Sequence, residues 1–102
     1  MEHLTATGPV LGSIAGMRFT SRTVPLASGD VMAFFTDGLT EAGVHRADML
    51  EIEGVEEIFR ASTADPSATP RQIVTRMMTS VIEQVTPAGL RDDVCLLVAR
   101  VD

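Results

Sequence analysis

Three aspartates occupy positions from which their carboxylates can act together on a metal ion. Asp37 directly follows an apolar run at residues 31–36, and Asp92 and Asp93 directly precede a second apolar run at residues 94–99. If the two runs are neighbouring antiparallel strands, the end of the first lies beside the start of the second, and the carboxylates converge at one rim of a sheet. Their mutual repulsion is relieved by a proton, by an arginine, or by a hard cation such as Mg²⁺ or Mn²⁺. Asp37, Asp92 and Asp93 are therefore candidate metal ligands.

A purely structural interpretation of the same residues is the alternative. Asp37 and Gly38 form an Asp-Gly pair, which is common in turns, and aspartate often ends or interrupts a strand. Gly38 would also let the backbone turn sharply beneath a metal site. The single cysteine, Cys95, cannot form an internal disulfide, and its place in an apolar run favours a buried, inert thiol over a nucleophile. Residue types and spacing alone leave the metal site and the turn as alternatives.

The strands that would carry these aspartates are predicted from their apolar character. Residues 31–36 and 94–99 are apolar without alternation, which is typical of strands buried on both faces. Residues 17–26 predict a strand with weak alternation, and the proline within them places it at a sheet edge or marks its end. Residues 27–30 predict a turn that joins this strand to the next as a hairpin. The glycine-punctuated residues 8–16 predict a strand or a loop.

Two helices are predicted before the last strand. The first covers residues 53–61. The second covers residues 70–85, because Thr69 can cap the free amides and Pro70 suits the first helical position. Its apolar residues recur at helical spacing, which predicts a face packed in the core, the alternative being a methionine-containing groove for a partner. These apolar residues are Ile73, Val74, Met77, Met78, Val81, Ile82 and Val85.

The predicted order is strand, strand, helix, helix, strand, which gives an α+β fold with a mainly antiparallel sheet. Two helices on one face leave the other face of the sheet without a covering layer. Apolar strands exposed in this way are rare in soluble monomers. The chain is therefore expected to fall short of a complete sandwich and to associate as a homodimer or larger species.

Composition bounds the class of protein. The chain has 102 residues, 45% of them hydrophobic, and a mean hydropathy of +0.21, which together predict one small packed domain. The net charge of −6 and the absence of lysine argue against a nucleic-acid partner. No apolar run is long enough to cross a membrane, and the first residues lack the character of a signal peptide. A cytoplasmic location is therefore expected.

Three segments of the chain, in the same order and register, resemble motifs of a known family. Leu26-Ala27-Ser28-Gly29-Asp30-Val31 and Thr36-Asp37-Gly38-Leu39-Thr40-Glu41-Ala42 resemble the motif L-x-x-G-D … (S/T)-D-G-(L/V)-x-E-A. Arg91-Asp92-Asp93-Val94-Cys95-Leu96-Leu97-Val98 resembles D-D-(I/M)-T-L-(L/V)-V, with cysteine in place of the usual threonine or serine. Gly8-Pro9-Val10-Leu11-Gly12 is similar to G-x-P-L-G, with the proline displaced by one position. The family is the stage II sporulation protein E-like branch of the PPM (protein phosphatase 2C) superfamily.

This resemblance implies a fold, an activity and a ligand set. The fold would be half of a four-layer αββα sandwich, and the activity metal-dependent hydrolysis of phosphoserine and phosphothreonine. Two Mn²⁺ or Mg²⁺ ions would activate a water molecule that attacks the phosphorus. By motif, Asp37 and Asp92 would be ligands of one ion, Asp93 being the alternative to Asp92, and Glu41 would support the loop rather than bind metal. The implied substrates are phosphoproteins such as anti-sigma-factor antagonists in bacterial signalling.

The resemblance also implies ligands that these residues do not include. The family's metal centre uses an aspartate from an early strand and an Asp-Gly pair within a G-D-x-x-G-H-G segment, which does not occur before Asp37. The chain is therefore expected to be the C-terminal part of a phosphatase domain, as a fragment or an autonomous half-domain, and to be inactive alone. The alternative function is a non-catalytic interaction module that dimerises through its uncovered sheet face.

Overall fold

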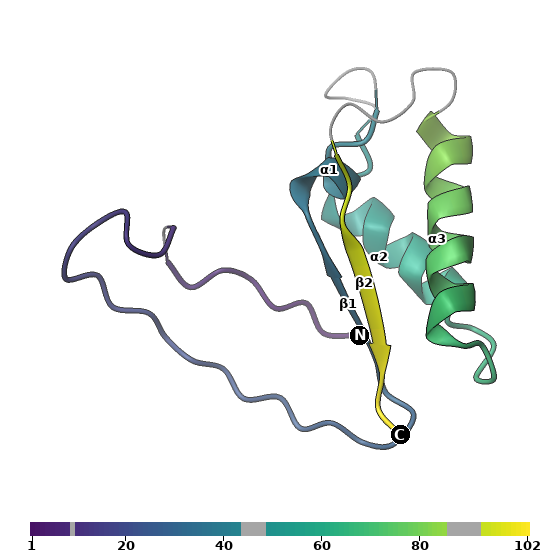
Figure 1. Ribbon diagram of the computed structural model, residues 1–102, viewed down its shortest axis with the longest axis horizontal. Coiled ribbons are helices and arrows are strands. Elements are labelled where there is room, and N and C mark those ends of the chain that lie inside the picture. Colours follow the sequence, from purple (N-terminus) through teal and green to yellow (C-terminus); the bar gives the residue numbers. More distant parts are fainter. Residues whose placement is uncertain (9, 44–48, 86–92) are drawn as a thin grey trace.

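The computed structural model of the chain describes residues 1–8, 10–43, 49–85 and 93–102. The described elements follow in the order β1 (Val31–Phe35), α1 (Asp37–Thr40), α2 (Glu51–Ser62), α3 (Pro70–Val85) and β2 (Leu96–Arg100). Figure 1 shows the two strands side by side, with α2 and α3 beside them and a long N-terminal arm reaching away. The architecture is α+β, as the sequence predicts.

The two strands form an antiparallel sheet that joins distant parts of the chain. Val31 lies opposite Arg100, and Phe35 lies opposite Leu96. The predicted antiparallel pairing of the strands next to the aspartates is therefore confirmed, although β1 ends one residue earlier than predicted and β2 runs from Leu96 to Arg100 rather than over residues 94–99. The ladder is short, so the residues just beyond its ends contribute to fixing its register.

Beyond the ladder, Thr36 and Cys95 exchange two hydrogen bonds. The Thr36 N–H donates to the Cys95 carbonyl at 3.1 Å, and the Cys95 N–H donates to the Thr36 Oγ1 at 3.0 Å. The side chain of Thr36, whose backbone is still extended, thus continues the pairing by one step beyond the end of β1. This pair fixes how the end of β1 lies against the start of β2.

The predicted hairpin between residues 17–26 and β1 is wrong. Residues 17–26 form no strand, and β1 pairs with β2 within the described residues. The middle of this segment is polar, so pairing it with β1 would bury little apolar surface, whereas β2 brings Leu96 and Val98 onto the helical core. The predicted turn at residues 27–30 is nevertheless present and is closed by Asp30 N–H donating to the Ala27 carbonyl at 3.0 Å.

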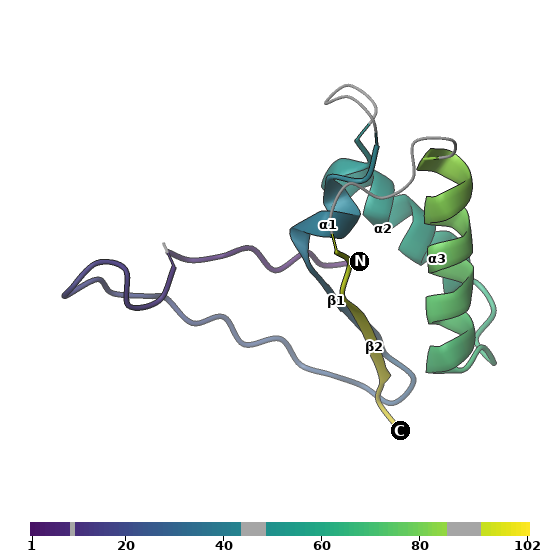
Figure 2. The ribbon, with the colours of Figure 1, turned by 45° about the horizontal axis from the view of Figure 1, so that its top comes forward.

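Residues 1–8 and 10–30 belong to an arm that leaves the body, turns and comes back to β1 (Figures 1 and 2). Residues 8–16, which predict a strand or a loop, contain no strand among those described. Two contacts join the outgoing and the returning segment of the arm. Arg22 Nη2 and Glu2 Oε1 form an ion pair of 3.1 Å, and the Phe19 ring fills the space beside Gly8. The Cα radius of gyration is 15.4 Å, against about 13 Å for a compact chain of this length.

Helices α2 and α3 pack against each other, and α3 packs against β2. The buried residues of α3 are Ile73, Met77, Val81 and Val85, and their four-residue repeat confirms the predicted core-facing stripe for these positions. Ile82, which the sequence places in the same stripe, is 50% exposed and corrects that part of the prediction. α2 begins two residues earlier than predicted and ends one residue later. The core consists of Leu39, Ala42, Val55, Ile58, Ala68, Ile73, Met77, Val81 and Val85.

The start of α3 is closed by reciprocal hydrogen bonds, which leads to a first prediction. The Thr69 N–H donates to Gln72 Oε1 at 2.9 Å, and the Gln72 N–H donates to Thr69 Oγ1 at 3.2 Å. Thr69→Ala removes one half of this capping box and is expected to lower the free energy of unfolding by about 0.5–2 kcal/mol in urea denaturation. Thr75→Ala, at an exposed position inside the same helix, is the control and is expected to be neutral or stabilising. Equal losses in the two variants would contradict the capping role.

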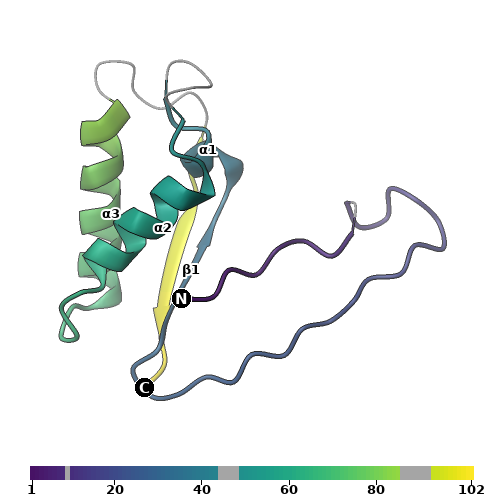
Figure 3. The same cartoon turned by 180° about the vertical axis from the view of Figure 1, so that it is seen from behind.

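The two faces of the sheet differ sharply in burial. Val31, Phe35, Leu96 and Val98 pack against the core, and Figure 3 shows α2 and α3 on one side of the strands. The opposite side, called here the outer face, carries the alternate residues. These are Met32, Phe34 and Thr36 from the β1 side and Cys95, Leu97 and Ala99 from the β2 side.

On the outer face, Phe34 is 58% exposed and Leu97 is 55% exposed. The prediction that the helices cover one face only is confirmed, while burial of both faces is wrong for this chain by itself. Cys95 is exposed as well, which corrects the expectation of a buried thiol. The reason is the strand alternation, which places Cys95 on the same side as Leu97.

Candidate functional site

Asp37 is the first residue of α1 and lies immediately beyond the end of β1. Its side chain is exposed at the rim of the sheet. Thr36 precedes it in an extended conformation (φ −94°, ψ 169°) and makes no side-chain capping bond to α1; its hydroxyl accepts the Cys95 N–H. α1 is not predicted from the sequence, since four residues are too few to show a helical period.

Asp93 lies against the start of α1. A Cβ built on Gly38 would overlap the carbonyl oxygen of Asp93 and would lie 3.2 Å from Val94 Cγ2. The backbone that carries Asp37 and the backbone that carries Asp93 are therefore in direct contact, and both side chains are exposed. The expected convergence of the two strand ends at one rim is borne out for these two residues.

Gly38 has a different role from the one expected. The sequence predicts a glycine that allows a sharp turn, but Gly38 is not among the residues with positive φ. It is buried, and its missing side chain leaves room for the Asp93 carbonyl. Close approach of two backbone segments, rather than backbone conformation, is what requires glycine here.

The other carboxylates in the motif segments are those of Asp92, Glu41 and Asp30. Asp92 lies outside the described residues. Glu41 is exposed at the end of α1, where its N–H donates to the Asp37 carbonyl at 2.8 Å. Asp30 lies at the opposite end of β1, and its Oδ2 accepts the Ala27 N–H at 2.8 Å, in agreement with its interpretation as a turn residue.

The described residues do not complete a metal site. Among residues 1–8, 10–43, 49–85 and 93–102, no group of three or more His, Cys, Asp and Glu is arranged to hold an ion. Asp37 and Asp93 have hard oxygen donors that suit Mg²⁺ or Mn²⁺, but two such residues do not fill a coordination shell. The roles of Asp37, Asp92 and Asp93 as ligands stay a prediction.

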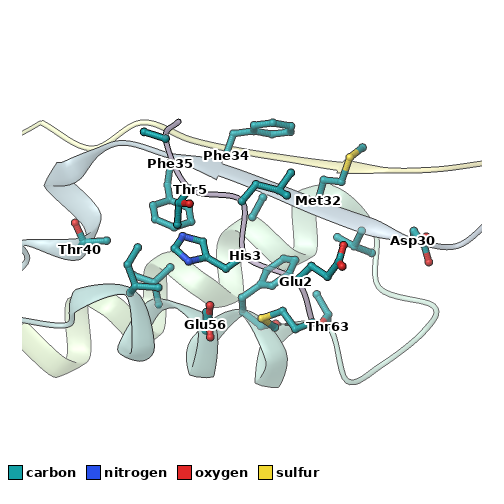
Figure 4. Close-up of a pocket in the computed structure, with 18 of the residues that line it drawn as sticks. Glu2, His3, Thr5, Asp30, Met32, Phe34, Phe35, Thr40, Glu56 and Thr63 are labelled. Carbon is teal, nitrogen blue, oxygen red and sulfur yellow. Dashed lines mark hydrogen bonds between the residues drawn. The ribbon is translucent and has the colours of Figure 1, made fainter. Parts of the chain in front are cut away.

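A groove of about 1010 Å³ opens beside the rim, between the N-terminal segment, β1 and α2. Figure 4 shows His3 projecting into it from the N-terminal segment, with Phe35 of β1 and Glu56 of α2 on its walls. Asp37 and Thr40 line it as well. Sequence reasoning missed this groove, because residues 1–6 have no period or motif that would indicate a contact with β1.

Comparison with models of known protein families gives a match over the whole chain. The family model described as Stage II sporulation protein E (SpoIIE) matches residues 1–102. No match was found among curated proteins or among solved structures. In the part of the chain that the structure describes, none of the helices has both the length and the apolar character that crossing a bilayer requires.

Proposed function

Because the chain belongs to the stage II sporulation protein E (SpoIIE) family, we propose that it forms the C-terminal half of a metal-dependent phosphoserine/phosphothreonine phosphatase domain. The observation that carries this proposal is the packing of the Asp93 carbonyl on Gly38, which holds Asp37 and Asp93 at one rim. The two family motifs that contain aspartate meet at this contact, although they lie far apart in the sequence.

The proposed cofactor is Mn²⁺ or Mg²⁺, held at the rim by Asp37 together with Asp92 or Asp93. When bound, such ions lower the pKa of a water molecule and hold phosphate oxygens during hydrolysis. The residues of this chain fix the relative position of Asp37 and Asp93. Two hydrogen bonds between Thr36 and Cys95 hold the end of β1 against the start of β2, and Gly38 lets the backbone of α1 contact the Asp93 carbonyl. The remaining ligands would have to come from the half of the domain that carries the G-D-x-x-G-H-G segment, so this chain is proposed to be inactive by itself.

The proposed architecture is half of an αββα sandwich. α2 and α3 over β1 and β2 would be one helix layer and one sheet layer, and the outer face would be the surface that packs on a second sheet. The proposed substrate is a phosphoprotein, such as an anti-sigma-factor antagonist in bacterial signalling. Family membership supports this class of substrate. The exposure of Phe34 and Leu97 supports the outer face as the surface that packs on the second sheet.

Metal titration tests the proposed ligands. Mn²⁺ is expected to bind the chain weakly, because a partial ligand set leaves most of the coordination shell to water. Asp37→Asn is expected to abolish this binding, measured by calorimetry or by the electron paramagnetic resonance signal of free Mn²⁺. Asp30→Asn, at the other end of β1, is the matched control, and it keeps an oxygen that can accept the Ala27 N–H.

Two results would contradict the assignment. Tight binding of two ions that survives Asp37→Asn would place the metal site elsewhere. Hydrolysis of p-nitrophenyl phosphate by the purified chain with Mn²⁺, lost in Asp37→Asn, would show that the ligand set is already complete.

A non-catalytic interaction module is the second candidate function. The observation that favours it is the exposure of Phe34 and Leu97 on the outer face. One variant distinguishes the two candidate functions. Asp37→Asn should eliminate phosphatase activity in any assembly that contains this chain. It should leave an interaction through the outer face intact.

A further inference from the structure

The pairing of β1 with β2 uses only one edge of β1. The Thr36 N–H donates to the Cys95 carbonyl beyond one end of the ladder, and the Val101 N–H donates to the Asp30 carbonyl at 2.9 Å beyond the other. In an antiparallel ladder every second residue is hydrogen-bonded to the partner strand. The residues of β1 between these two pairs therefore alternate, and the backbone groups of every other one point to the opposite edge, called here the free edge. These residues are Val31, Ala33 and Phe35.

The free edge has no neighbouring strand among the described residues. An unpaired edge presents a row of N–H and C=O groups that a further strand can satisfy. Sheets in folded domains usually have about 4–6 strands, whereas the described sheet has two. The free edge is thus a border at which the sheet can continue, and it is distinct from the outer face, which is the surface of the sheet.

The groove beside the rim follows this edge. All of β1 lines it, together with Asp30 before the strand and Asp37 after it. Its volume of about 1010 Å³ is at the upper limit of small-molecule pockets, which measure about 300–1,000 Å³. A space of this size beside a row of backbone donors and acceptors fits an extended chain segment. The apolar residues that line it from α2 are Ile52, Val55 and Phe59.

The charge of the groove restricts what this segment carries. Glu56 of α2 lies on its wall (Figure 4) and is half-buried. In the part of the chain that the structure describes, the Glu56 carboxylate forms no ion pair. Asp30 and Asp37 add negative charge at the two ends, and no arginine is among the described lining residues. A half-buried carboxylate of this kind favours a basic side chain as its partner.

We infer that a strand from the remaining part of the phosphatase domain adds to the free edge of β1 and directs an arginine or a lysine at Glu56. The inference rests on the proposed function, because the strand comes from the half of the domain that would supply the other metal ligands. A strand at this edge continues the same sheet layer and leaves the outer face for the second sheet. It also brings that half of the domain to Asp37, where the groove meets the rim.

Binding of a short peptide tests the charge requirement. The probe alternates valine with threonine, carries one central arginine and is followed by fluorescence anisotropy with a metal chelator present. Glu56→Gln is expected to weaken its binding about 10-fold, the effect of losing one charged hydrogen bond. Glu57→Gln is the matched control, because it makes the same change of charge on the same helix at an exposed position outside the groove. A peptide with glutamate in place of the arginine should bind more weakly than the probe.

Two measurements test the pairing with the free edge. Ala33→Pro removes an N–H from this edge without removing a ladder bond to β2, so it should abolish peptide binding while the helical circular dichroism is retained. Hydrogen exchange in the unchanged chain gives the same information without a variant. The peptide should slow exchange of the Val31, Ala33 and Phe35 amides and leave those of Met32 and Phe34, which already pair with β2, unchanged.

Three results would overturn the proposal. The first is failure of the arginine peptide to bind, or equal binding by the Glu56→Gln and Glu57→Gln variants. The second is binding without protection of the free-edge amides. The third is tighter binding of a phosphoserine version of the peptide, which would assign the groove to a substrate instead. Because no measurement involves metal or hydrolysis, a failure of the phosphatase assignment would be seen separately, in the metal titration.

Discussion

Ile73→Ala is expected to lower the free energy of unfolding by about 2–5 kcal/mol. Ile73 has no exposed surface and lies in α3 on the side that faces the core. The truncation removes buried methyl and methylene groups and leaves a cavity that the small core cannot fill by collapse. Domains of this kind are typically stable by only about 5–15 kcal/mol, so the variant should show a large fall in the midpoint of urea denaturation.

The same helix contains the control for this experiment. Ile82 is 50% exposed, so Ile82→Ala removes fewer contacts and gains the higher helix propensity of alanine. Its cost is expected to stay below about 1 kcal/mol. If the two substitutions destabilised the protein equally, the orientation of α3 against the sheet would be wrong.

Gly38→Ala is expected to destabilise the protein and to separate the strand ends at the rim. In an ordinary exposed helix position, glycine to alanine is stabilising by about 0.4–1 kcal/mol. At Gly38 the new Cβ would overlap the carbonyl oxygen of Asp93, which is backbone and cannot rotate away. Overpacking of this kind typically costs about 1–3 kcal/mol, so the sign of the effect is reversed.

Gly54→Ala in α2 is the comparison for Gly38→Ala. A Cβ at Gly54 would lie 3.1 Å from Leu50 Cβ, a tight contact that a shift of a few tenths of an ångström relieves, whereas the Cβ at Gly38 would overlap a backbone carbonyl. Urea denaturation should show Gly54→Ala as neutral or stabilising and Gly38→Ala as destabilising. Hydrogen exchange should show the amides of Thr36 and Cys95 less protected in Gly38→Ala alone. Stabilisation by both substitutions would refute the contact between Gly38 and Asp93.

The sequence predicts the parts of the fold that depend on local signals. α3 has a threonine cap, a proline at its first position and a four-residue apolar repeat, and its predicted bounds of 70–85 agree with the structure. The turn at residues 27–30 is equally local and is also correct. The choice of partner for β1 is not local, because it depends on which strand brings apolar side chains onto the helices, and the predicted hairpin with residues 17–26 fails for that reason.

The candidate site likewise has features that the sequence predicts and features that depend on contacts between distant segments. The meeting of Asp37 and Asp93 at one rim was predictable, because Asp37 follows one apolar run, Asp93 precedes the other, and antiparallel pairing brings such positions together. Their role as metal ligands stays a prediction. The function of Gly38 was not predictable, since a close approach between two backbone segments leaves no trace in local sequence. The groove beside β1 depends on residues 1–6, whose packing follows from the path of the whole arm.

The contact between Thr36 and Cys95 joins residues 59 positions apart, whereas α2 and α3 follow each other across a short loop. Closing a long loop costs more conformational entropy than closing a short one, and pairing of distant segments is slow. We therefore expect the helical hairpin to form before the strand pair during folding. The rim that holds Asp37 beside Asp93 is then expected to assemble on helices α2 and α3 that are already packed, a sequence that hydrogen exchange during refolding would test.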